Sequence, residues 1–239
     1  FGTDKPDLRN PLRIVDVTDF FQRCTFKPFH GKTVRAIKVH AEMSKGFHEK
    51  LLKFAQEIGM GGLGYLEVLE DRTYKGPIDK FIPDDMKAEI ANIAGLAAGD
   101  TIFFIADNEE QAADYAGQIR NELGKRLDLY EKNAYRFCFV NDFPMYEYDK
   151  EEKKIIFTHN PFSMPQGGLE ALNTKKPEEI LAYQYDIVCN GVELSSGAVR
   201  NHDLDIMVKA FEIAGYTEED LKEKFGALYN AFQFGAPPH

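Results

Sequence analysis

The dipeptide Asn190-Gly191 lies between two apolar runs and constrains the fold more than any other feature of the sequence. Both residue types tolerate the positive φ that a two-residue type I′ turn demands, so the dipeptide predicts a β-hairpin. Other short apolar runs, at residues 136–140 and 154–157, are separated by Pro, Gly and Asn turns. This pattern is typical of an antiparallel sheet. We therefore expect antiparallel strands in the last part of the chain, followed by two closing helices.

The turn also predicts which side chains share a face of the hairpin. Cys189 would pair with Val192, Val188 with Glu193 and Asp186 with Ser195. Because residues alternate faces along a strand, the side chains expected on one face are Asp186, Val188, Glu193 and Ser195. Two carboxylates at such diagonal positions repel each other unless a cation lies between them, and oxygen ligands suit Mg²⁺. A solvated acidic face explains the same spacing, so the sequence leaves both interpretations open.

The first part of the chain alternates strand and helix patterns and reads as a compact α/β or α+β unit of about 110 residues. Apolar runs predict strands at 34–39, 65–69 and 101–106, and helices are expected at 44–58, from 83 onward and at 108–126. Ser44 is the expected N-cap of the first of these helices, because a serine side chain can accept a hydrogen bond from the first turn. We detect no internal repeat.

The charge of the chain limits how it could bind nucleic acid. The formal net charge is −10, which argues against nucleic-acid binding through overall electrostatics. Residues 23–53 break the trend with eight Lys or Arg and two Glu, a net of +6 that could attract phosphates or simply form a solvated face.

Three widely spaced cysteines predict neither disulfides nor a zinc site and fit a reducing cytoplasm. No apolar stretch approaches the roughly 20 residues that a membrane-spanning helix needs.

Two further residues are candidates for substrate contact. Arg200 follows the hairpin after a run of small residues, and a guanidinium can bind a carboxylate through two parallel hydrogen bonds. His159 opens a loop with two prolines and two glycines. Taken singly, an arginine is more often part of a surface salt bridge, and such a histidine is more often a structural turn residue. No Ser-His-Asp or Cys-His arrangement indicates a protein nucleophile.

Five segments in order give the chain a resemblance to the bacterial-type aspartyl-tRNA synthetases, a class II family. They are Phe1-Gly-Thr-Asp-Lys-Pro-Asp-Leu-Arg9, Asn141-Asp-Phe-Pro-Met-Tyr-Glu147, His159-Asn-Pro-Phe-Ser-Met-Pro165, Tyr185-Asp…Asn190-Gly-Val-Glu193…Arg200 and Phe225-Gly…Phe234-Gly-Ala-Pro-Pro-His239. The resemblance implies an α+β fold with a partial class II antiparallel catalytic sheet and an inserted α/β domain similar to a domain of the glutamyl-tRNA amidotransferase subunits. The implied boundaries are 1–16 for the start of the catalytic segment, 17–132 for the insertion and 133–239 for the rest of the catalytic segment, truncated before the third class II motif.

The resemblance also implies an activity and roles for individual residues. Glu193 would contact ATP and Mg²⁺, Asp186 would be the second metal carboxylate, and Arg200 and His159 would bind the aspartate substrate. The implied reaction is that of an aspartate–tRNA ligase, which uses ATP to form aspartyl-adenylate and transfers the aspartyl group to tRNA(Asp), with tRNA(Asn) left open. Many bacterial members have a second histidine where Asn160 stands, and glycines in place of the two serines after Leu194.

The implied whole enzyme is a cytoplasmic homodimer that does not bind membranes. Because the expected catalytic segments are incomplete, we expect this chain to be inactive by itself. The alternative hypothesis is a binding module without chemistry of its own, which would contact tRNA or protein through the insertion and its basic window at residues 23–53.

Overall fold

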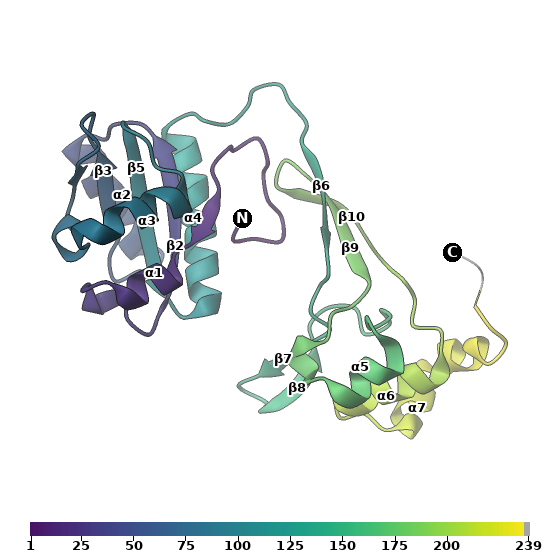
Figure 1. Ribbon diagram of the computed structural model, residues 1–239. Helices are drawn as coiled ribbons and strands as arrows, with labels where there is room; N and C mark the ends of the chain where they lie inside the picture. Colours follow the sequence, from purple (N-terminus) through teal and green to yellow (C-terminus); the bar gives the residue numbers. More distant parts are fainter. Residues whose placement is uncertain (237–239) are drawn as a thin grey trace. The chain divides into compact units, whose positions relative to one another are not determined.

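The structure is a computed structural model that describes residues 1–236. Contacts between residues divide the chain into two units, the first spanning Phe1–Arg136 and the second starting at Phe137 (Figure 1). Residues 1–16, which we expect to begin the catalytic segment, pack within the first unit. The boundaries of the insertion and of the catalytic segments remain predictions.

The first unit is built on a five-stranded antiparallel sheet with the order β1-β2-β5-β3-β4. The strands are β1 (Ile14–Asp16), β2 (Thr33–His40), β3 (Gly64–Val68), β4 (Tyr74–Lys75) and β5 (Asp100–Asp107). The central strands β2 and β5 pair over their full length, from Thr33 opposite Asp107 to His40 opposite Asp100. The three strands expected from apolar runs are confirmed, whereas the short strands β1 and β4 carry too few apolar residues to be recognised in the sequence.

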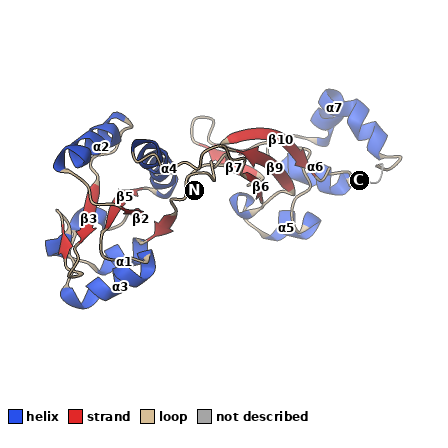
Figure 2. Ribbon diagram, turned by 90° about the horizontal axis from the view of Figure 1, so that it is seen from above, coloured by secondary structure: helices blue, strands red, loops and turns tan. Residues whose placement is uncertain are grey.

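Helices cover both faces of this sheet. They are α1 (Thr18–Arg23), α2 (Lys45–Glu57), α3 (Asp84–Ala94) and α4 (Glu109–Arg126), with short 3₁₀ turns η1 (Lys27–Phe29) and η2 (Asp79–Phe81). Figure 2 shows α2 and α4 on one face and α1 and α3 on the other. Ser44 caps α2 as expected, since its side chain accepts a hydrogen bond from the backbone N–H of Phe47.

Two apolar cores result, one on each face of the sheet. Alternation along β5 sends Ile102 and Phe104 into the core beneath α1 and α3, and Phe103 and Ile105 into the core beneath α2 and α4. All four side chains are at most 1% exposed. A strand that is buried on both faces reads as a continuous apolar run, which is why residues 101–106 predicted it so clearly.

The second unit carries a three-stranded antiparallel sheet in the order β10-β9-β6 and a separate two-stranded ribbon of β7 and β8. The strands are β6 (Phe137–Asn141), β7 (Tyr146–Asp149), β8 (Lys154–Phe157), β9 (Gln184–Cys189) and β10 (Val192–Ala198); the helices are α5 (Gly168–Thr174), α6 (Leu204–Ile213) and α7 (Glu218–Phe232), with a 3₁₀ turn η3 (Pro177–Glu179). The expected antiparallel strands and two closing helices are confirmed.

The closing helices pack against each other and against the loop before α5. Thr217 and Asp220 form the capping box of α7, in which each side chain bonds the other residue's backbone N–H. Leu221 and Tyr229 of α7 are buried with Met207 and Phe211 of α6. Antiparallel sheets and separate helices make the whole chain α+β, which confirms the expected fold class. No helix within residues 1–236 is both long enough and apolar enough to cross a membrane.

Candidate functional site

The hairpin predicted from Asn190-Gly191 is present and joins β9 to β10. Asn190 has φ 53° and Gly191 has φ 82°, the positive values that a type I′ turn requires. Cys189 pairs with Val192, and Val188 pairs with Glu193, as expected. The turn chemistry therefore set the register at this end of the hairpin.

The register differs from the prediction beyond Glu193, because a β-bulge shifts β10 by one residue between Glu193 and Ser195. Ser195 lies opposite Ile187, and Ser196 lies opposite Asp186, so the expected pairing of Asp186 with Ser195 is wrong. The bulge inserts one extra residue into β10 and thereby moves Ser195 to the other face. Directly paired residues share a face, so Asp186 and Glu193 remain on the same face, with Ser196 in place of Ser195.

The Asp186 carboxylate is the most unusual group on this face. Asp186 is only 5% exposed, and its Oδ1 atom is buried without a hydrogen-bond partner among the residues that the structure describes. Burying an unpaired carboxylate oxygen costs free energy unless a positive group approaches it. Glu193 on the adjacent strand is exposed. One buried and one exposed carboxylate suit a cation that is held partly by protein and partly by substrate.

The loop that follows β8 is bound to the segment that carries Arg200. Ser163 forms an isolated antiparallel bridge with Arg200, and the backbone N–H of Met164 donates to the Val199 carbonyl oxygen at 2.8 Å. The Asn201 N–H donates to the carbonyl oxygen of Phe162, also at 2.8 Å. The structure thus brings the loop that begins at His159 next to Arg200, although 40 residues separate them in the sequence.

Asn160 fixes the start of this loop. Its side-chain Oδ1 accepts a hydrogen bond from the Phe162 N–H at 2.9 Å, and its backbone carbonyl accepts one from the Ser163 N–H at 3.2 Å. An asparagine side chain that bonds the backbone two residues ahead stabilises a turn. Asn160 therefore has a structural role at the start of this loop.

Both predicted substrate contacts are exposed residues that lie beside an aromatic ring. The Arg200 guanidinium lies 5.9 Å from the centre of the Phe162 ring. The His159 ring meets the Phe143 ring edge to face, with 5.0 Å between their centroids. Both residues are exposed, so each has an aromatic partner on one side and remains accessible to a ligand on the other.

The candidate site is elongated along the hairpin. Glu193 lies beside the turn, and Arg200 lies just past the open end of β10. At about 3.3 Å per residue, the seven steps from Glu193 to Arg200 correspond to at most about 23 Å along the chain. Asp186 lies between, opposite Ser196. A ligand that contacts all three residues would have to be elongated. One of its ends would face the carboxylates of Asp186 and Glu193, with or without a metal ion, and the other would face the Arg200 guanidinium.

Two buried polar residues near this loop were not predicted from the sequence. Ser163 and Asn201 are both 0% exposed, and neither the Ser163 hydroxyl nor either side-chain polar atom of Asn201 has a hydrogen-bond partner within residues 1–236. Ser163 lies four residues after His159, and Asn201 directly follows Arg200. The only sequence signal is that closeness to the predicted contacts, because a single serine or asparagine carries no pattern of its own.

A family model described as tRNA synthetases class II (D, K and N) matches residues 1–239. The chain belongs to this class II family. It is 53% identical over 246 residues to the aspartate–tRNA(Asp/Asn) ligase of Ehrlichia chaffeensis, and 54% identical over 246 residues to that of Gluconobacter oxydans. The protein of the same name from Rickettsia bellii is 50% identical over 250 residues.

These comparisons cover all of this chain but only part of each relative. The alignments include 100% of the chain and 42%, 41% and 42% of the three relatives, so the chain spans about two fifths of their length. The resemblance to class II aspartyl-tRNA synthetases is thereby confirmed over the whole chain. The roles of Asp186, Glu193, His159 and Arg200 remain predictions that the geometry accommodates.

Proposed function

We propose that this chain forms part of an aspartate–tRNA ligase that activates L-aspartate with ATP and transfers it to tRNA(Asp), and also to tRNA(Asn). The observation that carries the proposal is the β9–β10 hairpin, which places Asp186 and Glu193 on one face and Arg200 at its open end. The names of the relatives support the substrates, since each is an aspartate–tRNA(Asp/Asn) ligase. The isolated chain remains predicted to be inactive, and the full-length protein to be a homodimer in the cytoplasm.

The chain's own residues would divide the two substrates between the two ends of the hairpin. Arg200 would bind the side-chain carboxylate of aspartate through paired N–H donors, and His159 would contact the same substrate from the adjoining loop. Glu193 and Asp186 would face the triphosphate end of ATP. The α-carboxylate oxygen of aspartate would then attack the α-phosphorus, and pyrophosphate would leave. A terminal ribose hydroxyl of tRNA would next attack the acyl carbon and release AMP.

The two carboxylates fit a magnesium ion. Among residues 1–236, no three His, Cys, Asp or Glu side chains gather into a metal-binding cluster. Mg²⁺ commonly takes one or two protein carboxylates and completes its shell with water and phosphate oxygens. The partnerless Oδ1 of Asp186 supports its role as one ligand, with Glu193 as the other. When bound, the ion would neutralise phosphate charge during displacement of pyrophosphate.

The ion pairs of the basic window weaken the alternative of a nucleic-acid binding module. Five of its eight cations bind carboxylates, in the pairs Arg23–Glu89, Arg35–Asp16, Lys38–Asp100, Lys45–Glu49 and Lys53–Glu57. Three of these partners, Asp16, Glu89 and Asp100, lie on elements outside the window. The positive charge of residues 23–53 is therefore largely neutralised in the fold, which favours a solvated face over an RNA-binding patch.

The decisive experiment is aspartate-dependent ATP–pyrophosphate exchange by a full-length protein that contains this chain. We expect exchange with aspartate and none with asparagine, because neutral asparagine cannot form the charge-assisted pair with Arg200. Arg200→Ala should reduce exchange roughly hundredfold or more without lowering thermal stability. Arg126→Ala removes another arginine, which forms an ion pair with Glu122, and serves as the matched control.

Two results would contradict the proposal in different ways. A folded wild-type protein that shows no exchange with aspartate, ATP and magnesium would remove the ligase function itself. Equal exchange by wild type and Arg200→Ala would leave the reaction in place but remove Arg200 from the substrate site.

A further inference from the structure

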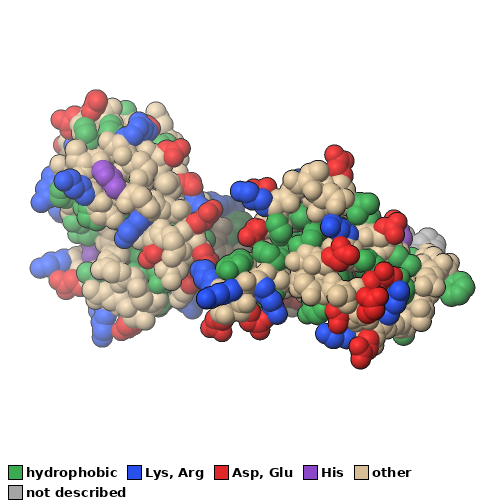
Figure 3. Space-filling model, turned by 90° about the horizontal axis from the view of Figure 1, so that it is seen from below, with side chains coloured by type: hydrophobic (Ala, Val, Ile, Leu, Met, Phe, Trp, Pro, Cys, Tyr) green, Lys and Arg blue, Asp and Glu red, His purple; other side chains and the backbone are tan. Residues whose placement is uncertain are grey.

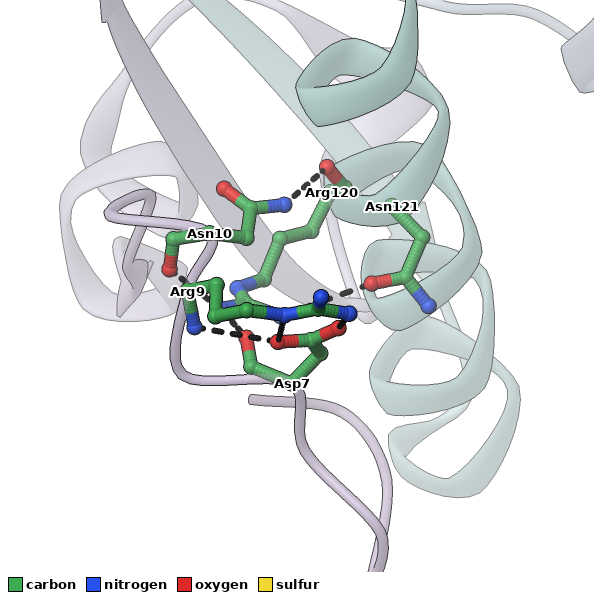
Figure 4. A network of polar contacts seen from close by, with 5 residues as sticks. All are labelled: Asp7, Arg9, Asn10, Arg120 and Asn121. Atoms are coloured by element: carbon green, nitrogen blue, oxygen red, sulfur yellow. Dashed lines mark hydrogen bonds and ion pairs between the residues drawn. The ribbon is translucent and has the colours of Figure 1, made fainter. Parts of the chain in front are cut away.

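Arg120 is a fully buried arginine that donates hydrogen bonds to three backbone carbonyl groups and, at 3.4 Å, to the side-chain oxygen of Asn121. It lies on α4 and is 0% exposed. Its Nε atom donates to the Leu12 carbonyl oxygen at 2.8 Å, and its Nη2 atom donates to those of Asp7 and Asn10 at 3.0 and 2.7 Å. Figure 4 shows the guanidinium enclosed by the bend of residues 7–10 beside α4. One side chain therefore ties down three carbonyl groups of the segment that enters the first unit.

Asn10 makes this attachment reciprocal. Its side-chain amide donates to the carbonyl oxygen of Arg120 at 2.9 Å, and its side-chain oxygen accepts from the Leu12 N–H at 3.1 Å. Asn10 is also 0% exposed. The side chain of each residue thus binds the backbone of the other, which fixes the segment to α4 in one register.

Glycines on the same side of α4 let the segment approach closely. A Cβ atom on Gly117 would lie 2.5 Å from the carbonyl oxygen of Gly2, and one on Gly124 would lie 2.4 Å from the side-chain amide nitrogen of Asn10. Gly117, Arg120 and Gly124 are three and four positions apart, so they occupy one face of the helix. At positions 117 and 124, this face has no room for a side chain beside the segment of residues 1–12.

The segment that leaves the first unit is attached at the same place. The Leu129 N–H donates to the Gly124 carbonyl oxygen at 2.9 Å, and the Glu131 N–H donates to that of Arg9 at 3.1 Å. The Arg9 guanidinium also lies 5.8 Å from the centre of the Tyr130 ring. The entering and leaving segments are therefore joined to each other as well as to α4.

We propose that Arg120 is a positioning residue. It holds residues 1–12 against α4 in the conformation that adenylation requires, so that this segment and the helix move together. The proposal rests on the proposed ligase function, because residues 1–9 are one of the segments that resemble the aspartyl-tRNA synthetases and are expected to begin the catalytic segment. Arg120 touches no substrate in this role. It would act on adenylation through the segment that it holds.

The chemistry of the site explains why an arginine is needed. A guanidinium carries five N–H donors in a flat, rigid fork and stays charged, so it can bind several carbonyl oxygens in one plane. A lysine ammonium is a point charge on a flexible chain and cannot reproduce that arrangement. Arg120→Lys should therefore rescue the function only in part, although it keeps the charge.

The test uses a full-length protein that contains this chain and two independent variants. Arg120→Ala removes the guanidinium. Gly117→Ala leaves Arg120 in place and pushes the segment away through its new Cβ atom, and alanine favours a helix more than glycine does, so α4 itself is not weakened. Arg126→Ala on the same helix is the control. Amide hydrogen exchange of residues 1–13 is measured together with the kcat and KM of aspartate-dependent ATP–pyrophosphate exchange.

We expect both variants to exchange the amides of residues 1–13 at least about tenfold faster, while β2 and β5 keep their protection. The kcat should fall roughly ten- to hundredfold with little change in either KM, because a misplaced positioning element affects the transition state more than ground-state binding. Millimolar guanidinium ion should partly restore Arg120→Ala and should not affect Gly117→Ala.

Unchanged protection of residues 1–13 in both variants would overturn the proposal. Faster exchange there with unchanged kcat would also overturn it, since the attachment would then serve stability alone. Should Arg120→Ala fail to fold, Gly117→Ala decides the outcome. Should the wild type not activate aspartate, the proposed ligase function fails, and the protection of residues 1–13 still decides whether Arg120 holds the segment.

Discussion

The two units are both built on antiparallel sheets, but they treat the faces of those sheets differently. In the first unit, helices cover both faces, and Phe103 and Phe104 of the central strand are at most 1% exposed. In the second unit, Phe137 and Phe139 of β6 are 59% and 64% exposed. Hydrophobic atoms reach the surface of the second unit beside acidic side chains on the face drawn in Figure 3. The first unit thus covers its own sheet, whereas the second leaves one apolar face open.

The two units also differ in how their fully buried polar residues are hydrogen-bonded. In the first unit, the fully buried polar side chains of Asn10, Asp100 and Arg120 are hydrogen-bonded within the unit. The part-buried His48 bonds Glu67 through Nε2, while its Nδ1 atom has no hydrogen-bond partner among residues 1–236. In the second unit, polar atoms of Ser163, Asp186 and Asn201 are buried without partners among the described residues. The first unit thus satisfies its fully buried charged side chains with its own groups. In the second unit, the polar atoms without partners lie near the candidate site. A ligand that formed hydrogen bonds with them would gain binding free energy.

The largest expected effect comes from one substitution made in both units of this chain. Phe103→Ala should destabilise the first unit by about 3–5 kcal/mol, because it opens a cavity in a closed core. Phe137→Ala should change the stability of the second unit by less than about 0.5 kcal/mol, as expected for an exposed position. Denaturant-dependent hydrogen exchange, followed separately for β5 and β6, measures both values. Similar losses at the two positions would contradict the contrast between a closed and an open sheet.

Asp186→Asn tests whether the second unit gives up stability for binding. Removing a buried carboxylate charge while keeping its shape should leave the unit as stable or raise its stability by up to about 1 kcal/mol. In the full-length protein, the magnesium concentration needed for half-maximal ATP–pyrophosphate exchange should rise roughly tenfold, because one ligand loses its charge. A magnesium titration and a thermal melt provide the two readouts. A clear loss of stability with normal magnesium dependence would make Asp186 a structural residue.

The smallest effect concerns pH and the entering segment of the first unit. Burial acts to raise the pKa of Asp7, but hydrogen bonds from Arg9 outweigh it and hold the pKa below its ordinary value. A lowered folded-state pKa adds stability above the unfolded value of about 3.9, and that stability is lost as pH falls through the folded pKa. Asp7→Asn should thus cost up to about 1 kcal/mol at pH 7, and this cost should disappear as the pH falls through the lowered pKa of Asp7.

Urea unfolding of wild type and Asp7→Asn across this pH range measures the difference between them. A difference that stayed constant from neutral to acid pH would show that Asp7 acts through its shape or backbone rather than through its charge.

Much of the fold was predictable because it depends on local chemistry. The buried run at residues 101–106 predicted β5, and Ser44 and Asn108 marked the starts of α2 and α4 with side chains that cap the first turn. The short strands β1 and β4 were missed, since their pairing depends on neighbours already in place rather than on their own residues. The shared face of Asp186 and Glu193 was predicted from the turn, but their roles in binding stay predictions.

The sequence by itself determined the turn at Asn190-Gly191, because positive φ values are a property of the residues that adopt them. It also determined the order of segments that places the chain among class II synthetases. Only the tertiary structure decided that a bulge sets Ser196 opposite Asp186, since register beyond a turn depends on the whole sheet. It alone decided the attachment at Arg120, because three of its acceptors are carbonyl groups that every residue possesses and that lie 108 to 113 positions away. A local sequence pattern cannot predict such a contact.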